Sequence, residues 1–375
     1  MKKQKWMAAL CCACFLTACG SMPQIQEEQV MSTPAMSSSI AADASSTTVS
    51  INEEGTFHLN PPTPLALGER VSSETAEFVI QYINLARKAT APMRTGSSIK
   101  GIGDDEYVLE LCIEYQNKTS AEKAIDELIS GVLVCSDGSK KVNGSIAVEE
   151  HNRGGLSIVR DDMMPALDTA YIHYMFIFQD QWLFSHNLKE VDLTIDSKEY
   201  TVALQDQNGE TIGISEDENV APFGTYSMGG VSATEYILGE TVTKEDLEFC
   251  VEHIDWAKEI YPYYEEKSDE YYPAEDGMLF FDICFMIHNR SDKTFEMDDL
   301  MNMKLWYQNS DQYSCFDVVE NTERTSFDLA YDYLEPQGTA YMHWLFEMPE
   351  EIGGSSNPMW ISFSLEDTIY TCKVR

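Results

Sequence analysis

Apolar and polar residues alternate along many short segments of the chain, and this alternation predicts β-strands. In residues 107–115 (YVLELCIEY), one side of the expected strand carries the apolar residues Tyr107, Leu109, Leu111, Ile113 and Tyr115. Residues 279–287 repeat the pattern with Leu279, Phe281, Ile283, Phe285 and Ile287. A period of two is typical of a strand that buries one face. Residues 71–88 have a less clear period, and we interpret them as a strand because Phe78, Ile80 and Tyr82 alternate with Glu77, Val79 and Gln81.

The chain repeats itself at a nearly constant distance. Residues 67–88 resemble 238–259, residues 107–120 resemble 279–292, and residues 196–204 resemble 366–374. The phrase TAYIHYMF at 169–176 returns as TAYMHWLF at 339–346. A shared order and spacing indicates a duplicated domain, and each copy is long enough to hold a core of its own.

The repeated phrase predicts a strand with two different faces. One face is apolar and is expected in the core, with Ile172, Tyr174, Phe176, Met342, Trp344 and Phe346. The other face carries the fold-signature residues Tyr171, His173, Tyr341 and His343. In the second copy, Leu334 and a Pro-x-Gly turn before Tyr341 resemble the tyrosine corner of Greek-key sandwiches, whereas the first copy keeps Leu167 and Tyr171 without the Pro-x-Gly turn. We expect the two histidines to be half-exposed in cross-strand pairs, because one histidine per domain is a poor metal site.

These patterns predict an all-β protein made of two tandem immunoglobulin-like (Greek-key) β-sandwiches. We place the first domain at residues 55–205, a linker at 206–235 and the second domain at 236–375. The motif LGE, a strand that ends in Asn-x-Thr/Ser, a Pro-x-Gly turn and the ending Phe346 to Pro349 together resemble a known group. The chain resembles the tandem immunoglobulin-like domains of unknown function found in lipoproteins of Gram-positive bacteria. The resemblance implies an extracellular sandwich and supplies no catalytic residues.

The N-terminus predicts a lipoprotein signal peptide. Lysines precede an apolar run from Met7 to Leu16, which is too short to span a bilayer, and the run ends in LTACG. This ending resembles a lipobox, which implies cleavage after residue 18 and lipidation of Cys19. Residues 19–54 are rich in Ser, Thr, Ala and Gln and predict a disordered tether. We therefore expect a lipid-anchored protein on the extracytoplasmic face of the cell membrane.

The charge balance excludes some partners. The chain has 25 Lys+Arg and 63 Asp+Glu, and removal of the three lysines in residues 1–18 leaves 22 − 63 = −41. Such an acidic protein is a poor partner for nucleic acid. Six cysteines follow Cys19, namely Cys112, Cys135, Cys250, Cys284, Cys315 and Cys372. Buried thiols are the simpler interpretation, although the compartment permits disulfides.

The copies differ most after their first strand. Residues 87–106 carry a net charge of 4 − 3 = +1, whereas residues 258–278 carry 2 − 7 = −5 and five tyrosines. Aromatic side chains beside carboxylates suit the binding of a cationic peptide, a sugar or calcium. The candidate binding loop therefore comprises Tyr261, Tyr263, Tyr264, Glu265, Glu266, Asp269, Tyr271 and Tyr272. Packing of the tyrosines over the end of the sandwich is the alternative.

We find no catalytic, phosphate-binding or cofactor motif in the sequence, and we expect no enzyme activity, cofactor or metal. The leading hypothesis is a non-enzymatic binding or interaction module at the cell envelope, with an envelope or surface protein, peptide or glycan as its ligand. The alternatives are an enzyme or accessory subunit whose site comes from distant loops, and a calcium-dependent structural spacer.

Overall fold

The computed structural model describes residues 49–51, 57–59, 61–93, 98–101, 105–142, 144–159, 162–205, 210–215, 226–264, 270–308, 311–313, 315–329 and 333–375. The predicted signal peptide, Cys19 and most of the predicted tether lie outside these residues. The strand β1 (Val49–Ile51) falls within the predicted tether and pairs antiparallel with β2 (Phe57–Leu59). No helix in the described part of the chain has the length and hydrophobicity needed to cross a lipid bilayer.

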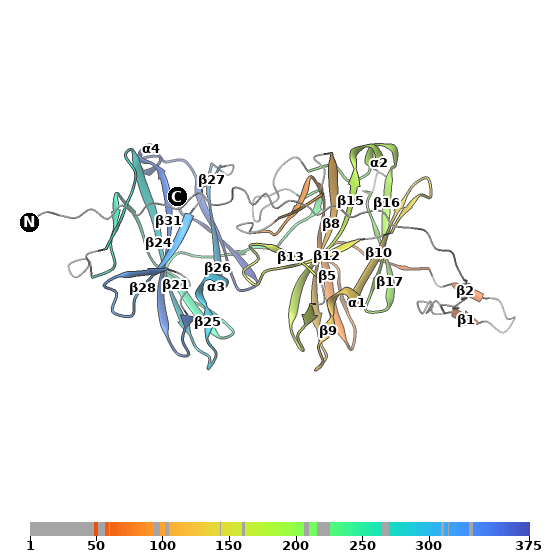
Figure 1. Ribbon diagram of the computed structural model, residues 1–375, viewed down its shortest axis with the longest axis horizontal. Helices are drawn as coiled ribbons and strands as arrows, with labels where there is room; N and C mark the ends of the chain where they lie inside the picture. The colour runs from red at the N-terminus through yellow and green to blue at the C-terminus, as the bar shows by residue number, and fades with distance from the viewer. Residues whose placement is uncertain are drawn as a thin grey trace, which may run out of the picture. The chain divides into compact units, whose positions relative to one another are not determined.

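The first sandwich contains two facing sheets (Figure 1). One has the strand order β11-β10-β16-β17-β3, and the other has the order β13-β12-β15-β8-β5 with β4 and β18 also paired to β5. The strands of the first sheet are β3 (Thr63–Pro64), β10 (Ile129–Cys135), β11 (Lys140–Lys141), β16 (Leu188–Ile195) and β17 (Lys198–Ala203). Those of the second are β4 (Arg70–Ser72), β5 (Ala76–Ala86), β8 (Glu106–Asn117), β12 (Ser145–Glu149), β13 (Leu156–Ile158), β15 (Thr169–Gln179) and β18 (Met228–Gly229).

The second sandwich repeats this arrangement, except that its described residues contain no strand equivalent to β18. Its sheets have the orders β19-β33-β32-β26-β27 and β20-β21-β24-β31-β28-β29. The strands of the first of these are β19 (Thr234–Glu235), β26 (Met301–Tyr307), β27 (Asp311–Tyr313), β32 (Met359–Leu365) and β33 (Thr368–Lys373). Those of the second are β20 (Val242–Lys244), β21 (Leu247–Ala257), β24 (Met278–Asn289), β28 (Cys315–Glu320), β29 (Phe327–Leu329) and β31 (Thr339–Pro349).

Short elements connect the strands in equivalent places. The hairpins are β6 (Lys88–Thr90) with β7 (Ser98–Lys100), β22 (Glu259–Ile260) with β23 (Tyr272–Pro273), β9 (Lys123–Ala124) with β14 (Met163–Met164), and β25 (Phe295–Glu296) with β30 (Tyr333–Leu334). The one- to two-turn helices are α1 (Ile125–Leu128), α2 (Asp180–Ser185), α3 (Met297–Leu300) and α4 (Glu350–Gly353).

The strand orders have the immunoglobulin topology. The seven main strands of the first copy, lettered A to G in chain order, are β5, β8, β10, β12, β15, β16 and β17. In the larger sheet, strand E (β15) lies between B (β8) and D (β12). In the smaller sheet, strand F (β16) lies beside C (β10). This is the ABED and CFG arrangement of an immunoglobulin constant-type sandwich. The prediction of two tandem immunoglobulin-like β-sandwiches is thus confirmed. The segment predicted as a linker contains β18, which pairs with β5 of the first sandwich.

Each sandwich has its own main core, formed by the apolar faces that the sequence predicts. Ile172, Tyr174 and Phe176 belong to the first core, and Met342, Trp344 and Phe346 belong to the second. A second apolar layer covers the opposite face of the sheet that contains β15 or β31. It comprises Ala89, Ala91, Ile99, Val108, Ala147, Leu156 and Met175 in the first copy, and Ile260, Phe280, Val318, Phe327 and Leu345 in the second.

That second layer changes the environment of the fold-signature residues. The face that carries His173 and His343 was expected to be half-exposed, and this prediction is wrong because the histidines are 0% and 1% exposed. Tyr82 packs edge-on against His173 and Phe327 packs edge-on against His343. The hairpins outside the sheet add Ala89, Ile99 and Ile260 to the apolar layers on this face. The tyrosine-corner interpretation also fails. Tyr171 and Tyr341 lie on the strand equivalent to E, whereas a tyrosine corner lies at strand F, and both rings pack on arginines.

The paired asparagines Asn117 and Asn289 hold turns, as the sequence suggested. Asn289 is fully buried, and its Nδ2 donates to the carbonyls of Lys293, Leu334 and Glu335 at 2.7, 3.2 and 3.0 Å. Asn117 donates in the same way to Ala121 and Pro165. The six cysteines after Cys19 are free thiols in the structure.

Candidate functional site

The first copy buries a cluster of ionisable side chains, the His173 cluster, on the outer face of its larger sheet. The cluster comprises Glu110 and Cys112 from β8, Glu149 from β12, Arg153 from the following turn, and Tyr171 and His173 from β15. The strand register places His173 directly opposite Cys112 on one side and Ala147 on the other. Glu149 follows two residues after Ala147 and therefore points to the same face.

His173 lies between two carboxylates in this cluster. Its Nε2 is 2.8 Å from Glu149 Oε1, and its Nδ1 is 3.4 Å from Glu110 Oε2. Arg153 Nε donates to Glu149 Oε2 at 2.7 Å, and the Arg153 guanidinium lies 3.6 Å from the centre of the Tyr171 ring. The histidine and the arginine thus balance the two buried acids.

The pKa values follow from this arrangement. Burial by itself lowers the pKa of His173, but contacts with Cys112, Glu110 and Glu149 outweigh burial and hold that pKa well above its ordinary value. Burial raises the pKa of Glu149, but Arg153 and His173 outweigh it, so the net shift is downward. Burial raises the pKa of the Cys112 thiol, which favours its protonated, unreactive form.

The second copy builds an equivalent His343 cluster from Asp282, Cys284, Glu320, Arg324, Tyr341 and His343. His343 Nδ1 is 3.0 Å from both carboxylate oxygens of Asp282, and its Nε2 is 3.5 Å from Glu320 Oε1 without a hydrogen bond. Arg324 pairs with Glu320 and donates to both oxygens of Glu252 at 3.0 and 2.8 Å. Its guanidinium lies 3.5 Å from the centre of the Tyr341 ring.

The pKa of His343 is also displaced. Burial by itself lowers it, but Asp282, Cys284 and Glu320 outweigh burial and hold it well above its ordinary value. Burial raises the pKa of the Cys284 thiol to about 11. The two clusters follow the spacing of the duplication, since 343 − 173 = 170 and 284 − 112 = 172. Each network was therefore present before the copies diverged or arose twice under the same constraint.

The copies differ at one position beside the cluster. Both first strands carry a β-bulge, between Ile80 and Tyr82 in β5 and between Val251 and His253 in β21. An extra residue in a strand shifts the following side chains to the other face. Tyr82 therefore lies opposite Cys112, and His253 lies opposite Cys284. Tyr82 is fully buried and stacks on Tyr226 at 3.8 Å, whereas the His253 side chain is 32% exposed.

The candidate binding loop is described in part. Glu265, Glu266 and Asp269 lie outside the described residues. Tyr261 and Tyr271 stack with ring centres 5.1 Å apart, and Tyr272 packs on Phe316 and Phe327 in the second apolar layer. Tyr272 is therefore a packing residue.

Two further tyrosines of the loop remain on the surface next to the His343 cluster. The backbone amide of Tyr263 donates to Glu320 at 2.6 Å, and that of Tyr264 donates to the carbonyl of Arg324 at 3.0 Å. The Tyr263 ring lies 4.2 Å from the Arg324 guanidinium. The backbone of Tyr263 and Tyr264 is thus tied to the buried cluster while their rings face solvent.

Comparison with known protein families and with curated proteins gives no match. Many solved structures match the chain, among them two bacterial proteins. One is an uncharacterized β-sandwich protein from Clostridium difficile 630, with 25% identity, a TM-score of 0.36, and coverage of 38% of this chain and 95% of that chain. The other is a conserved hypothetical protein from Bacillus anthracis, with 12% identity, a TM-score of 0.26, and coverage of 38% and 96%. Neither description states a function.

Sequence reasoning found His173, His343, Tyr171 and Tyr341 but missed their partners. Glu149 and Glu320 lie in a part of each copy where the two sequences have little else in common, and Arg153 and Arg324 follow four residues later in both. The sequence could have pointed to these partners, because a glutamate followed four residues later by an arginine recurs at the offset of the duplication. This pattern becomes meaningful only when the sheet places β12 beside β15 and β28 beside β31.

Proposed function

We propose that the protein is a lipid-anchored lipoprotein of the extracytoplasmic membrane face that acts as a non-enzymatic binding module. The lipobox-like segment before Cys19 supports the anchor. The tandem immunoglobulin topology supports a binding role, because this sandwich presents loops at its ends for recognition. The resemblance to immunoglobulin-like domains in lipoproteins of Gram-positive bacteria supports the same location.

The observation that carries the binding role is the set of exposed tyrosines on the second sandwich. Tyr263, Tyr264 and Tyr271 are 59%, 43% and 45% exposed. Tyrosine gives a large contact area at a small entropy cost, and it is enriched in binding hot spots. The backbone amides of Tyr263 and Tyr264 are already held by hydrogen bonds to Glu320 and Arg324, so these two residues have little backbone order to gain on binding. The matching segment of the first copy, residues 87–106, contains no tyrosine, and the next tyrosine along the chain is Tyr107.

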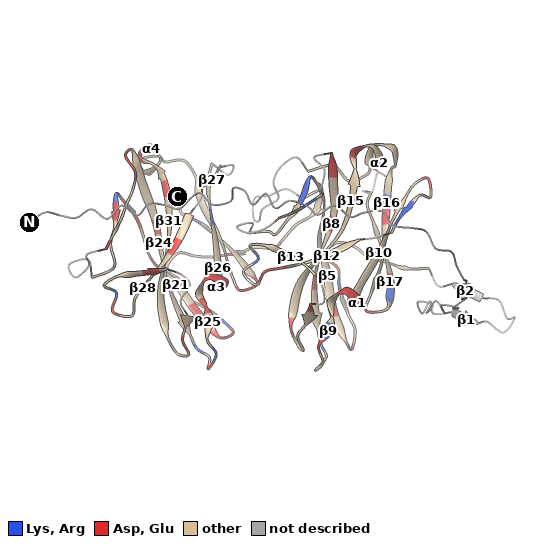
Figure 2. Ribbon diagram, in the orientation of Figure 1, with Lys and Arg blue, Asp and Glu red and all other residues tan. Residues whose placement is uncertain are grey.

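The chemistry around these tyrosines favours a cationic ligand. Residues 258–278 carry a net charge of −5, and Figure 2 shows that Asp and Glu outnumber Lys and Arg over the described strands and turns. Tyrosine faces attract Lys and Arg by cation–π contact, and nearby carboxylates add charge complementarity. We therefore expect a Lys- or Arg-rich segment of an envelope or surface protein.

A peptide array tests the binding role. The full chain is applied to peptides that differ in Lys and Arg content and to cell-wall glycans, and a variant with Tyr263→Ser, Tyr264→Ser and Tyr271→Ser is applied in parallel. We expect the triple variant to bind basic peptides at least tenfold more weakly. Tyr333→Ser is the matched control, because Tyr333 is 58% exposed elsewhere on the same sandwich. Equal binding by the wild-type chain and the triple variant contradicts the proposal.

Fatty-acid labelling tests the anchor. We expect the wild-type chain, expressed in a Gram-positive host, to incorporate labelled palmitate and to sediment with membranes. Cys19→Ser is expected to lose the label and to leave the membrane fraction. A wild-type chain without label, or a Cys19→Ser chain with the same label, rules out lipidation at this residue.

A further inference from the structure

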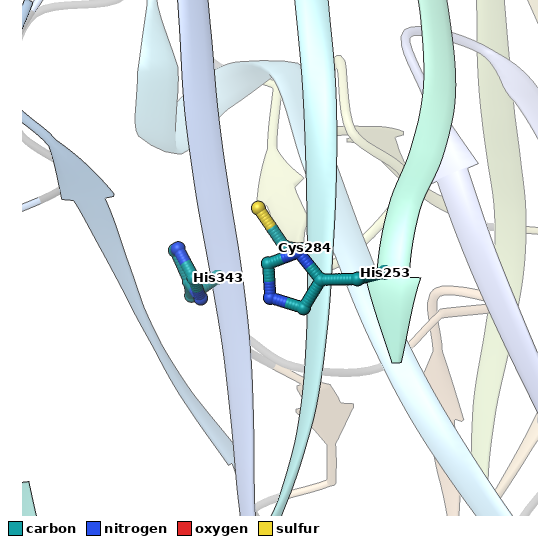
Figure 3. A group of neighbouring side chains, drawn as sticks. All are labelled: His253, Cys284 and His343. Atoms are coloured by element: carbon teal, nitrogen blue, oxygen red, sulfur yellow. The ribbon is translucent and has the colours of Figure 1, made fainter. Parts of the chain in front are cut away.

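We propose that the second sandwich binds one transition-metal ion of the zinc class through His253, Cys284 and His343. The three side chains come from the neighbouring strands β21, β24 and β31 and lie on the same face of the sheet (Figure 3). One nitrogen of each ring and the Cys284 sulfur all lie within 4.8 Å of one another. The site is distinct from the exposed tyrosines, and the proposal does not depend on the proposed binding role.

The strand register explains how these residues converge. Cys284 lies opposite His343 on one side and His253 on the other, so all three occupy one row across the sheet. His253 reaches this row only because the bulge in β21 adds one residue before it. The ring centres of His253 and His343 are 5.5 Å apart. Without the bulge, His253 would belong to the opposite, core-facing side of the strand.

The spacing suits a small ion. Zinc binds histidine nitrogen at about 2.0–2.1 Å and cysteine sulfur at about 2.3 Å, so tetrahedral ligand atoms are about 3.5 Å apart. The distances between the three donor atoms, all within 4.8 Å, are therefore close to the separation of ligand atoms around zinc. His253 is the partly exposed member of the set and is able to rotate toward the other two.

The surroundings also suit a cation. Asp282 accepts from His343 Nδ1 at 3.0 Å, and Asp282 Oδ2 lies 3.6 Å from His253 Nε2. A carboxylate that holds a histidine ring is a common partner of metal-binding histidines. The nearby carboxylates Glu252, Asp282 and Glu320 outweigh Arg324, since −3 + 1 = −2, and that excess favours a divalent cation.

The donor atoms select the class of metal. Two imidazole nitrogens and one thiolate suit zinc and related transition metals, whereas calcium and magnesium prefer oxygen ligands. The ion replaces the protons carried by the ring nitrogen and the thiol, and these protons pass to the buffer. The fourth position is open to water or to a carboxylate oxygen of Asp282.

The first copy provides a natural comparison because it lacks the second histidine. Tyr82 occupies the place of His253, and Tyr226 covers it at 3.8 Å. Cys112, Glu149 and His173 also have donor atoms within 4.8 Å of one another, but this set offers one imidazole nitrogen instead of two, and Glu149 already accepts from Arg153 Nε at 2.7 Å. We therefore expect one ion per chain, bound in the second copy.

Metal titration of the full chain tests the site. Cys11, Cys12, Cys14 and Cys19 are replaced by serine to remove competing thiols, no polyhistidine tag is present, and the protein is first treated with a chelator. We expect Zn²⁺ to bind with a stoichiometry of one, and Co²⁺ to give a thiolate-to-cobalt charge-transfer absorption. Replacement of Cys284 by alanine is expected to abolish that absorption.

The variant His253→Tyr assigns the site, because tyrosine is the residue that the first copy carries and tolerates at this position. It is expected to weaken Zn²⁺ binding at least tenfold with an unchanged circular dichroism spectrum. His288→Asn is the matched control. His288 also lies on β24 but outside the cluster, and its Nδ1 is 3.0 Å from Thr339 Oγ1. The triple tyrosine variant is expected to keep its zinc. Absence of zinc binding, two ions per chain, or binding retained in both His253→Tyr and Cys284→Ala overturns the proposal.

Discussion

Replacement of Glu149 by glutamine is expected to destabilise the first sandwich strongly. The substitution keeps the size of the side chain and removes one negative charge from the His173 cluster. Glu149 is 0% exposed at its side chain, and its partners Arg153 and His173 are 3% and 0% exposed. The perturbation therefore acts on a group that water does not reach.

The magnitude follows from the charges that remain. With both acids ionised and His173 protonated, Glu110, Glu149, Arg153 and His173 sum to −2 + 2 = 0. Glu149→Gln changes the sum to −1 + 2 = +1 and leaves a buried cation without its partner. Removal of one member of a buried ion pair costs about 3–5 kcal/mol. A domain has about 5–15 kcal/mol of stability, so a large share of it is expected to be lost.

Hydrogen exchange of the strands β8 and β15 measures this loss within the first sandwich alone. The control is Glu77→Gln, which removes a surface partner of Arg70 and is expected to change exchange little, because that arginine is half-exposed. The double variant Glu149→Gln with Arg153→Met restores neutrality (−1 + 1 = 0) and is expected to recover part of the stability. If Glu149→Gln changes exchange no more than Glu77→Gln does, the cluster contributes nothing and the reasoning is refuted.

Three further predictions concern other parts of the fold. The pKa of His173 in the folded protein lies above its unfolded value of about 6.5. The contribution of His173 to stability is therefore full below pH 6.5 and disappears as the pH rises through the folded pKa. Hydrogen exchange of β15, measured against pH, is expected to show this loss in the wild type and not in His173→Gln. Asn289→Ala removes an amide whose two N–H groups serve three backbone carbonyls, and it is expected to cost about 2 kcal/mol in urea unfolding, at about 1 kcal/mol for each N–H; an unchanged midpoint contradicts this. Gly229→Ala places a methyl group 2.5 Å from the Gln81 carbonyl at φ +76°, and is expected to raise exchange in β5 where Gly213→Ala does not.

The duplication made much of the fold predictable from the sequence. Two copies of each pattern reduced the ambiguity of a single strand, and a strand was correctly expected within residues 71–88, where β5 (Ala76–Ala86) lies. The expected common face of Phe78, Ile80 and Tyr82 is wrong, because the bulge turns Tyr82 to the other face. The core faces of β8 and β15 also followed from the period of two, since their apolar residues belong to the first core. These features depend on local alternation, which is visible in a one-dimensional pattern.

The environment of the opposite face was not predictable in the same way. A strand pattern does not show what covers its polar face, and His173 and His343 were therefore expected to be half-exposed. The rings that cover these histidines come from other strands, since Tyr82 of β5 packs against His173 and Phe327 of β29 packs against His343. Burial then forces each histidine to find charged partners, because an unpaired ionised group in the interior is costly.

The sequence alone therefore determined the number of sandwiches, their order and the residues of their main cores, because each depends on alternation within single strands and on the repeat between copies. The tertiary structure decided which side chains meet on the outer face of each sheet. A bulge of one residue turns His253 toward Cys284, and pairing of β31 with β24 and β28 brings His343 between Asp282 and Glu320. These side-chain contacts depend on the register and bulges of strands that are far apart in the chain, and no local sequence pattern encodes them.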